Sequence, residues 1–380
     1  MSHVTAPATL DALSGYVVGI TADRRWQEQA ELLERRGART IHGPCIRTFA
    51  LSTEDGVRAA TTELLARPPD AVVLTTGIGT RGWIGAVEGM GHGEDLVDAL
   101  DGAMVLARGP KAAGAALTAG IEVTWRAPGA RTAEVVGHLR EHADAGRRLR
   151  IAVQLDGDPD ARLVAALRAL GHEVVAVPVY RWTLPDDTAP ALRLIAAVCD
   201  GEVDAVTFTA GYTVGNLLAL ADGAGVRDRV VEQLATGAVT PVAIGPACAE
   251  RLRELGLGDP VEPATPRLGA MVRALTQTYA DRVRRLRLVG RDVLVQGRVV
   301  AANGDAPVEL SGREREVLDA LAQRPGAVVS KRALLERVWG GAETDEHVVE
   351  VTVARLRRRL GPAGTGIETV VRRGYRLAAD

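Results

Sequence analysis

Residues 149–180 read LRIAVQLDGDPDARLVAALRALGHEVVAVPVY, and residues 15–46 read GYVVGITADRRWQEQAELLERRGARTIHGPCI. Each stretch consists of an apolar strand, a polar loop, an amphipathic helix, a glycine and a second strand that ends near a proline. The two glycines, Gly37 and Gly171, hold the same place in the two stretches. We therefore interpret them as two copies of one strand–helix–strand unit.

The repeat continues beyond these two stretches. PDAVVLTTGIGTRG (69–82) is similar to VDAVTFTAGYTVGN (203–216), and Asp70 and Asp204 have the same spacing as the two glycines. VLARGPKAAGAALTAGIEV (105–123) is similar to PVAIGPACAERLRELGLGD (241–259). Strands that alternate with helices predict parallel sheets covered on both faces. The expected fold class is α/β, with two similar parallel-sheet domains and a cleft between them.

Length and composition exclude several classes of protein. A chain of 380 residues accommodates two to three domains. It has no apolar run of about 18 residues and no secretory leader pattern, so we expect a cytoplasmic protein without a membrane partner. Its three cysteines are widely spaced, which argues against a disulfide framework or a zinc site. We expect no metal and no cofactor.

After residue 260 the pattern changes. Residues 260–267, PVEPATPR, read as a linker, and strand-like text over 286–311 includes the hairpin signal Asn303-Gly304. Residues 311–340, SGREREVLDALAQRPGAVVSKRALLERVWG, then open with a capping box formed by Ser311 and Glu314.

The third predicted helix of this region has two unlike sides. It spans 345–360, DEHVVEVTVARLRRRL, and a rotation of about 100° per residue puts its apolar residues on one side. Those residues are Val349, Val353, Leu356 and Leu360. Residues 355–376 carry seven basic groups and one acidic group, whereas the whole chain has a net charge of only -2. A local basic surface of this kind predicts binding to double-stranded DNA.

Residues 286–378 resemble the OmpR/PhoB-type winged helix domain. The matching text is VELSGREREVLDALAQRPGAVVSKRALLERVWG, VVEVTVARLRRRL and IETVVRRGYRL. The resemblance implies that the helix near 346–360 enters the major groove, with Arg355 as base reader, and that a hairpin near 371–374 touches the minor groove. Dimers on repeated half-sites are common for such proteins. The predicted DNA-binding residues are Thr352, Arg355, Arg358, Arg359, Thr369, Arg372 and Arg373.

Residues 14–277 resemble uroporphyrinogen-III synthase through the order of GITADRR, DAVVLTT, ARGPKAAGAAL, DAVTFTA and AIGPACAERLRELG. The resemblance implies one domain from 14–43 plus 180–265 and a second from 44–179, joined by two crossings. A linker helix (266–285) and the winged helix domain (286–380) would follow. It also implies that the cleft holds a tetrapyrrole rich in carboxylates. The predicted ligand residues are Thr21, Thr75, Thr76, Gly77, Gly109, Lys111, Thr209, Gly211, Gly245 and Cys248.

Three functions are compatible with this combination. The synthase commonly has threonines after its Gly-Pro turns, but here Lys111 and Cys248 stand in those turns, and only Tyr180 is retained as a catalytic candidate. We therefore favour a DNA-binding regulator whose synthase-like region senses a small effector, a tetrapyrrole or a similar metabolite. The alternatives are an active synthase that cyclises hydroxymethylbilane with loss of water, and a scaffold that recruits another regulator. The turns are also compatible with ordinary strand–helix connections.

Overall fold

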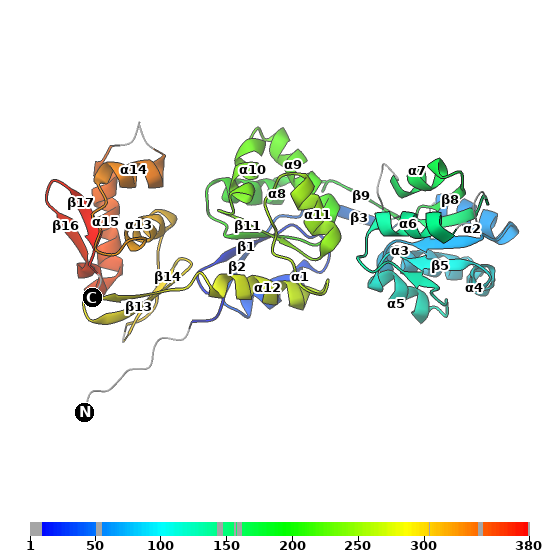
Figure 1. Cartoon of the computed structure of the whole chain (residues 1–380), viewed down its shortest axis with the longest axis horizontal. Coiled ribbons are helices and arrows are strands. Elements are labelled where there is room, and N and C mark those ends of the chain that lie inside the picture. Colours follow the sequence, from blue (N-terminus) through cyan, green and yellow to red (C-terminus); the bar gives the residue numbers. More distant parts are fainter. Residues whose placement is uncertain are drawn as a thin grey trace, which may run out of the picture. The chain divides into compact units, whose positions relative to one another are not determined.

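The computed structural model describes residues 10–50, 55–142, 147–155, 157, 162–303, 305–340 and 345–378 (Figure 1). The chain divides into two compact units, and each is described by itself. One unit is continuous, residues 44–188, and the other combines residues up to 43 with residues from 189 onward. Within the described residues, no helix is both long enough and apolar enough to cross a bilayer.

The unit of residues 44–188 is built on a five-stranded parallel sheet with the order β6-β5-β4-β7-β8. Its strands are β4 (Ala71–Leu74), β5 (Met104–Ala107), β6 (Trp125–Arg126), β7 (Arg150–Gln154) and β8 (Glu173–Val177). Its helices are α2 (Asp55–Ala66), α3 (Gly77–Gly89), α4 (Gly93–Asp101), α5 (Pro110–Thr118), α6 (Thr132–His142) and α7 (Arg162–Ala169).

Both faces of this sheet are buried, which explains why its strands are continuous apolar runs. Val72 and Leu74 belong to one hydrophobic cluster, while Ala71 and Val73 belong to another. Alternate residues of a strand point to opposite faces, so two clusters require helices on both sides. The predicted parallel α/β fold is confirmed here.

A second, two-stranded sheet sets the far boundary of this unit. β3 (Arg47–Ala50) pairs antiparallel with β9 (Tyr180–Thr183), so residues 180–183 belong with 44–188. The predicted division, which followed the resemblance to the synthase family, placed them with 14–43. The crossing at residues 43 and 44 agrees with the expected boundary, whereas the return crossing lies near 188 and 189.

The other unit contains a four-stranded parallel sheet with the order β11-β10-β1-β2, here called domain 1 together with its helices. Its strands are β1 (Val17–Ile20), β2 (Arg39–His42), β10 (Ala205–Phe208) and β11 (Thr240–Ala243). Its helices are α1 (Trp26–Glu34), α8 (Ala189–Cys199), α9 (Gly211–Gly223), α10 (Arg227–Ala235), α11 (Pro246–Glu254) and α12 (Leu268–Ala280).

Helix α12 was predicted as a linker, but it is part of domain 1. Tyr279 is fully buried, its ring centroid lies 4.4 Å from that of Tyr16, and its hydroxyl donates to the Asp204 carbonyl at 2.7 Å. Met271 and Leu275 are buried in the same cluster as β1. An amphipathic helix with a fully buried stripe is a structural element of the core rather than a spacer.

The remaining elements form the predicted winged helix domain. An antiparallel sheet of β12 (Arg284–Leu288), β13 (Arg291–Gln296), β14 (Val299–Ala302) and β15 (Val308–Glu309) comes first. Helices α13 (Gly312–Ala322), α14 (Lys331–Trp339) and α15 (His347–Arg359), a short 3-10 helix η1 (Gly361–Gly366) and the hairpin of β16 (Ile367–Val370) with β17 (Gly374–Leu377) follow. The Ser311–Glu314 capping box is confirmed. Gly304 of the hairpin signal lies outside the described residues.

Candidate functional site

Helix α15 presents one apolar side to the core and one arginine side to solvent. Val349, Val353 and Leu356 are buried, whereas Arg355 and Arg358 are exposed. Neither guanidinium has an ion pair or hydrogen bond with any other residue that the structure describes. Cationic groups that lack a protein counter-charge on an exposed helix face are suited to phosphates and base edges in a major groove.

Two other arginines of α15 have partners inside the domain. Arg357 donates to the Ile367 carbonyl at 2.8 Å and to the Thr369 hydroxyl at 2.9 Å. Arg359 donates to the Glu309 carbonyl at 2.8 Å and pairs with the Glu314 carboxylate at 3.1 Å. These two side chains tie α15 to its own domain, so the free positive charge of the helix resides on Arg355 and Arg358.

The predicted DNA contacts are therefore in three kinds of surroundings. Arg355 and Arg358 project freely, Arg359 and Thr369 are engaged in the internal bonds just described, and Thr352 is mostly buried. The Thr352 hydroxyl donates to the Val348 carbonyl at 2.7 Å, within its own helix. A threonine hydroxyl that bonds to the preceding turn is common in helices and leaves little hydrogen-bonding capacity for DNA.

The wing is the hairpin of β16 and β17, and its turn carries Arg372 and Arg373. Both side chains are exposed and without an ion-pair partner among the described residues, and Arg372 has a φ of 59°. Val371 at the same turn is 78% exposed. Gly374 closes the turn with a φ of +128°, and a Cβ there would lie 2.1 Å from the Val329 carbonyl oxygen. The wing backbone therefore needs glycine at this position.

Helices α14 and α15 are joined by an ion pair near the amino end of α15. Lys331 of α14 pairs with Glu350 of α15, and His347 lies 3.4 Å from the same carboxylate. The hydrogen bond from Lys331 lowers the pKa of Glu350. The carboxylate therefore stays charged at neutral pH and balances Lys331, which leaves the arginines at the other end of α15 as the excess charge.

In the unit of residues 44–188, the predicted ligand residues gather at the carboxyl edge of the parallel sheet. Thr75, Thr76 and Gly77 follow β4, and Thr76 caps α3 by accepting from the Gly79 N–H at 3.1 Å. The Tyr180 hydroxyl lies 3.3 Å from the Thr76 hydroxyl. Ligands of open α/β sheets bind at this edge.

The starts of helices α3 and α5 lie in contact at that edge. A Cβ on Gly77 would lie 2.4 Å from the Lys111 carbonyl oxygen, so the two helix starts approach closely only because residue 77 is glycine. Lys111 is exposed and directly follows Pro110, the first residue of α5, and Gly109 precedes that proline. The positive ends of two helix dipoles lie close together there, with a lysine beside them, and such a surface is suited to anions.

The carboxyl edge of domain 1 repeats this arrangement with fewer available side chains. Thr209, Gly211 and Gly245 lie at the starts of α9 and α11. The buried Thr21 hydroxyl donates to the Thr207 carbonyl at 2.7 Å. Cys248 is also buried, its sulfur lies 3.5 Å from the Phe208 carbonyl oxygen, and burial raises the pKa of its thiol to about 12. Thr21 and Cys248 therefore support the turns from within.

Sequence reasoning missed Gln154, which organises the first of these edges. Its Oε1 accepts from the backbone N–H groups of Thr75 and Thr76 at 3.2 and 3.1 Å, and its carbonyl accepts from the Thr75 hydroxyl at 2.8 Å. Gln154 is fully buried and ends the strand RIAVQ. A lone polar residue at the carboxyl end of an apolar strand was the available signal.

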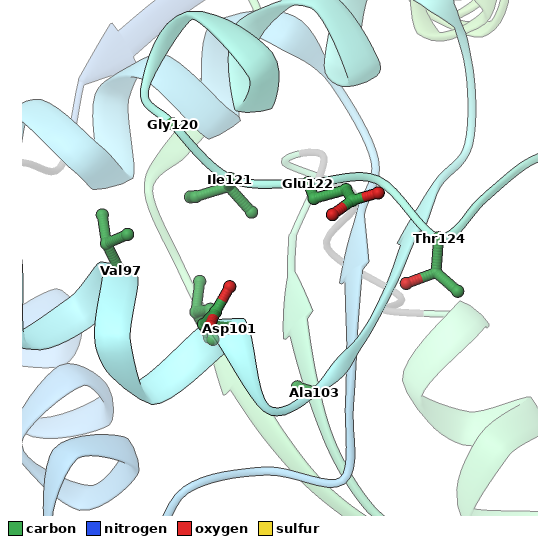
Figure 2. A pocket seen from close by; sticks show the side chains of 8 residues that line it. Val97, Asp101, Ala103, Gly120, Ile121, Glu122 and Thr124 are labelled. Carbon is green, nitrogen blue, oxygen red and sulfur yellow. The ribbon is translucent and has the colours of Figure 1, made fainter.

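The 44–188 unit also has a small hollow that lies away from the carboxyl edge of its sheet (Figure 2). It encloses about 80 Å³ and is lined by Val97, Asp101, Ile121 and their neighbours. Ala103 and Thr124 in its wall precede β5 and β6, which puts the hollow at the amino edge of the sheet. Pockets for small organic ligands are usually several times larger, about 300–1,000 Å³. The hollow is therefore no candidate ligand site.

Comparison with known proteins assigns the two parts of the chain. The family described as uroporphyrinogen-III synthase HemD matches residues 27–273, and the family described as transcriptional regulatory protein, C terminal, matches residues 305–377. A crystal structure of a mutant uroporphyrinogen III synthase from Thermus thermophilus is similar with a TM-score of 0.58 and 32% identity, covering 70% of this chain and 99% of that chain.

Two curated relatives agree with this division. The uncharacterized protein YjjA of Bacillus subtilis is 28% identical over 270 residues, which cover 71% of this chain and 98% of YjjA. The transcriptional regulatory protein TcrA of Mycobacterium tuberculosis is 40% identical over 79 residues, which cover 20% of this chain and 31% of TcrA. The chain belongs to the uroporphyrinogen-III synthase HemD family and carries a C-terminal OmpR/PhoB-type DNA-binding domain.

Proposed function

We propose that this protein is a one-component transcription regulator that binds promoter DNA through α15 and the wing and senses a small anionic effector through its synthase-like region. The fusion of the two families supports a regulator. The observation that carries the DNA-binding surface is the pair Arg355 and Arg358, exposed and without a protein counter-charge. Arg372 and Arg373 at the wing turn add two more exposed cations to this domain.

The DNA-binding part is tested with the purified full chain and fluorescent duplexes from its own upstream region. We expect retardation at low salt and a steep loss of affinity between 50 and 200 mM salt, because phosphate contacts release counterions. Two protomers on repeated half-sites would give two steps of retardation. Absence of binding to every upstream fragment at low salt would contradict the proposal.

The effector is proposed from the chemistry of the strand edge. Two helix starts in contact, with Lys111 exposed beside them, favour carboxylates. A tetrapyrrole with several carboxylate side chains fits this chemistry, and uroporphyrin III is the probe of choice. We expect the full chain to quench its fluorescence saturably, and Lys111→Ala to weaken binding. Arg140→Ala on α6 is the matched control, because its side chain is exposed and has no ion pair or hydrogen bond among the described residues.

A specific observation keeps the synthase as the second candidate function. The Tyr180 hydroxyl lies 3.3 Å from the Thr76 hydroxyl at the strand edge, where it could assist the loss of a hydroxyl from a linear tetrapyrrole. The test is incubation with hydroxymethylbilane and separation of uroporphyrinogen isomers. Formation of the type III isomer that Tyr180→Phe slows would support the enzyme, whereas type I alone, the product of spontaneous closure, would exclude it.

A further inference from the structure

Asp204 connects domain 1 to the winged helix domain. The residue precedes β10 and is 6% exposed. One carboxylate oxygen accepts from the Val17 backbone N–H at 2.8 Å, which holds β1 beside β10. The other accepts from Arg315 at 2.5 Å, and Arg315 is part of α13 in the winged helix domain. One buried carboxylate thus binds a strand of one domain and a helix of the next.

The internal repeat supplies a natural control for this arrangement. Asp70, which corresponds to Asp204, precedes β4 and accepts from the Arg150 backbone N–H at 2.7 Å. Its other oxygen accepts at 3.1 Å from Arg147, which lies in the same unit and is 60% exposed. The bond to the neighbouring strand is therefore common to both copies, and only the second oxygen differs. In domain 1 that oxygen serves the winged helix domain.

Backbone contacts beside the ion pair show that the two domains meet closely. The Arg298 N–H donates to the Gly15 carbonyl at 2.8 Å, and the Gln296 amide donates to the Asp11 carbonyl at 2.6 Å. Gly15 has a φ of +80°, and a Cβ on Gly297 would lie 2.4 Å from the Gly15 carbonyl oxygen. The turn between β13 and β14 therefore rests directly on the turn before β1, with backbone against backbone at Gly15 and Gly297 and the Gln296 side chain beside them.

The same end of α13 is bound to the DNA-binding helix. Glu314, adjacent to Arg315, is 3% exposed, accepts from the Ser311 N–H at 2.8 Å and pairs with Arg359 of α15 at 3.1 Å. At the other end of the path, β10 (Ala205–Phe208) lies between Asp204 and Thr209, which is at the carboxyl edge of the domain 1 sheet. A continuous chain of hydrogen-bonded elements therefore links that edge to α15, while Arg355 remains exposed.

We propose that the Asp204–Arg315 pair is an interdomain clamp that holds the winged helix domain on domain 1 as one body and carries changes at the β1–β10 edge to α15. Arg315 is a positioning residue in this proposal, because it acts on DNA binding through α13 and Glu314. The second part rests on the proposed sensing function, whereas the first part is independent of it. Coupling between the two binding sites requires that this joint have a second arrangement, which a change at the β1–β10 edge would favour.

Hydrogen exchange of the full chain tests the clamp without any ligand. In Arg315→Gln we expect amide exchange about tenfold faster over residues 11–17 and 291–299, because a charged hydrogen bond at the joint is lost. The cores of both domains should keep their protection. Arg147→Gln, which removes the corresponding partner of Asp70, should leave these two segments unchanged. Equal exchange in wild type and Arg315→Gln would overturn the proposal.

A conservative variant distinguishes a clamp from a general structural need. Arg315→Lys keeps the charge and should retain part of the protection, since a lysine ammonium can reach the Asp204 carboxylate but cannot face Asp319 at the same time as the guanidinium does. If both Arg315 variants lose protection throughout the domain cores, Arg315 supports folding in general and the clamp is refuted. This test uses the full chain and does not depend on the stability of the isolated winged helix domain.

The signalling part is measured separately with uroporphyrin III as probe and a duplex that the wild type binds. We expect the probe to change wild-type DNA affinity, and Arg315→Gln to bind the probe normally while that change falls at least threefold. If wild type binds the probe without any change in DNA affinity, the proposed sensing function is wrong. The clamp is still tested in that case, because hydrogen exchange measures it without the probe. An unchanged response in Arg315→Gln would refute transmission through the pair.

Discussion

Replacing Arg355 with alanine should lower the affinity for a specific DNA site much more than it lowers the free energy of unfolding. Arg355 is exposed on α15 and makes no internal ion pair or hydrogen bond among the described residues. A bidentate arginine contact with a base is worth about 1–3 kcal/mol of discrimination, which corresponds to a loss of about 5- to 150-fold in affinity for the specific site. Its contribution to the free energy of unfolding should be within about 0.5 kcal/mol, as for other free surface residues.

The assay is fluorescence anisotropy with a duplex selected by the wild type from random sequences and with an unrelated duplex, each at several salt concentrations. If Arg355 reads a base, the variant loses affinity chiefly for the selected duplex. Arg372→Ala combined with Arg373→Ala should weaken both duplexes alike. Each lost phosphate contact lowers the magnitude of the slope of log affinity against log salt concentration by about 0.9. The fold-change in affinity between 50 and 200 mM salt therefore becomes about three- to fourfold smaller.

Two arginines of the same domain serve as controls. Arg285→Ala changes an exposed side chain of β12 that has no ion pair or hydrogen bond among the described residues, and it should alter neither affinity nor stability. Arg357→Ala removes hydrogen bonds to two residues of β16 and should lower the melting temperature. The reasoning is refuted if Arg355→Ala affects both duplexes equally, or no more than Arg285→Ala does.

Three further outcomes follow from residues away from the DNA surface. Gly374→Ala should destabilise the winged helix domain by about 2 kcal/mol or more in thermal unfolding, since its Cβ would collide with a carbonyl oxygen at a positive φ, whereas Gly312→Ala, with open space around it, should be nearly neutral. Burial raises the pKa of the Cys45 and Cys248 thiols from the usual thiol value of about 9 to about 12, so folding favours the protonated form; the contribution of these thiols to stability should be constant below pH 9 and fall between pH 9 and 12, and a contribution that rises over that range would contradict the burial. Gln154→Leu leaves the backbone N–H groups of Thr75 and Thr76 without their acceptor, and it should lower the free energy of unfolding by about 2–4 kcal/mol in denaturant titrations. An unchanged free energy of unfolding would show that water replaces the amide.

The local patterns of the sequence were sufficient to predict most of the fold. The apolar stripe of α15 is buried at Val349, Val353 and Leu356 because helix geometry alone fixes which residues share a side. The capping box at Ser311 was predictable for the same reason, since both of its bonds lie within four residues. The repeat identified the two parallel sheets through their strand–helix alternation.

Contacts between distant residues were not predictable in this way. The positive side of α15 divides into free and internally bonded arginines only once the positions of Glu314 and β16 are known. Gln154 holds a turn that lies far from it in sequence, and Arg315 meets Asp204 across a domain boundary. No periodicity encodes such pairs, because they depend on how finished elements pack against one another.

The direct contact of the turns at Gly15 and Gly297 has a consequence for protein engineering. A hybrid that carries a different DNA-reading module on this scaffold must keep the two turns and the arginine that faces Asp204, and cutting the chain at the start of β12 would separate them. The natural unit of exchange is therefore the module together with residues 11–17. These two parts are far apart in the chain: Gln296 and Asp11, which are in contact, are separated by 285 residues. Sequence boundaries and exchangeable parts do not coincide in this protein.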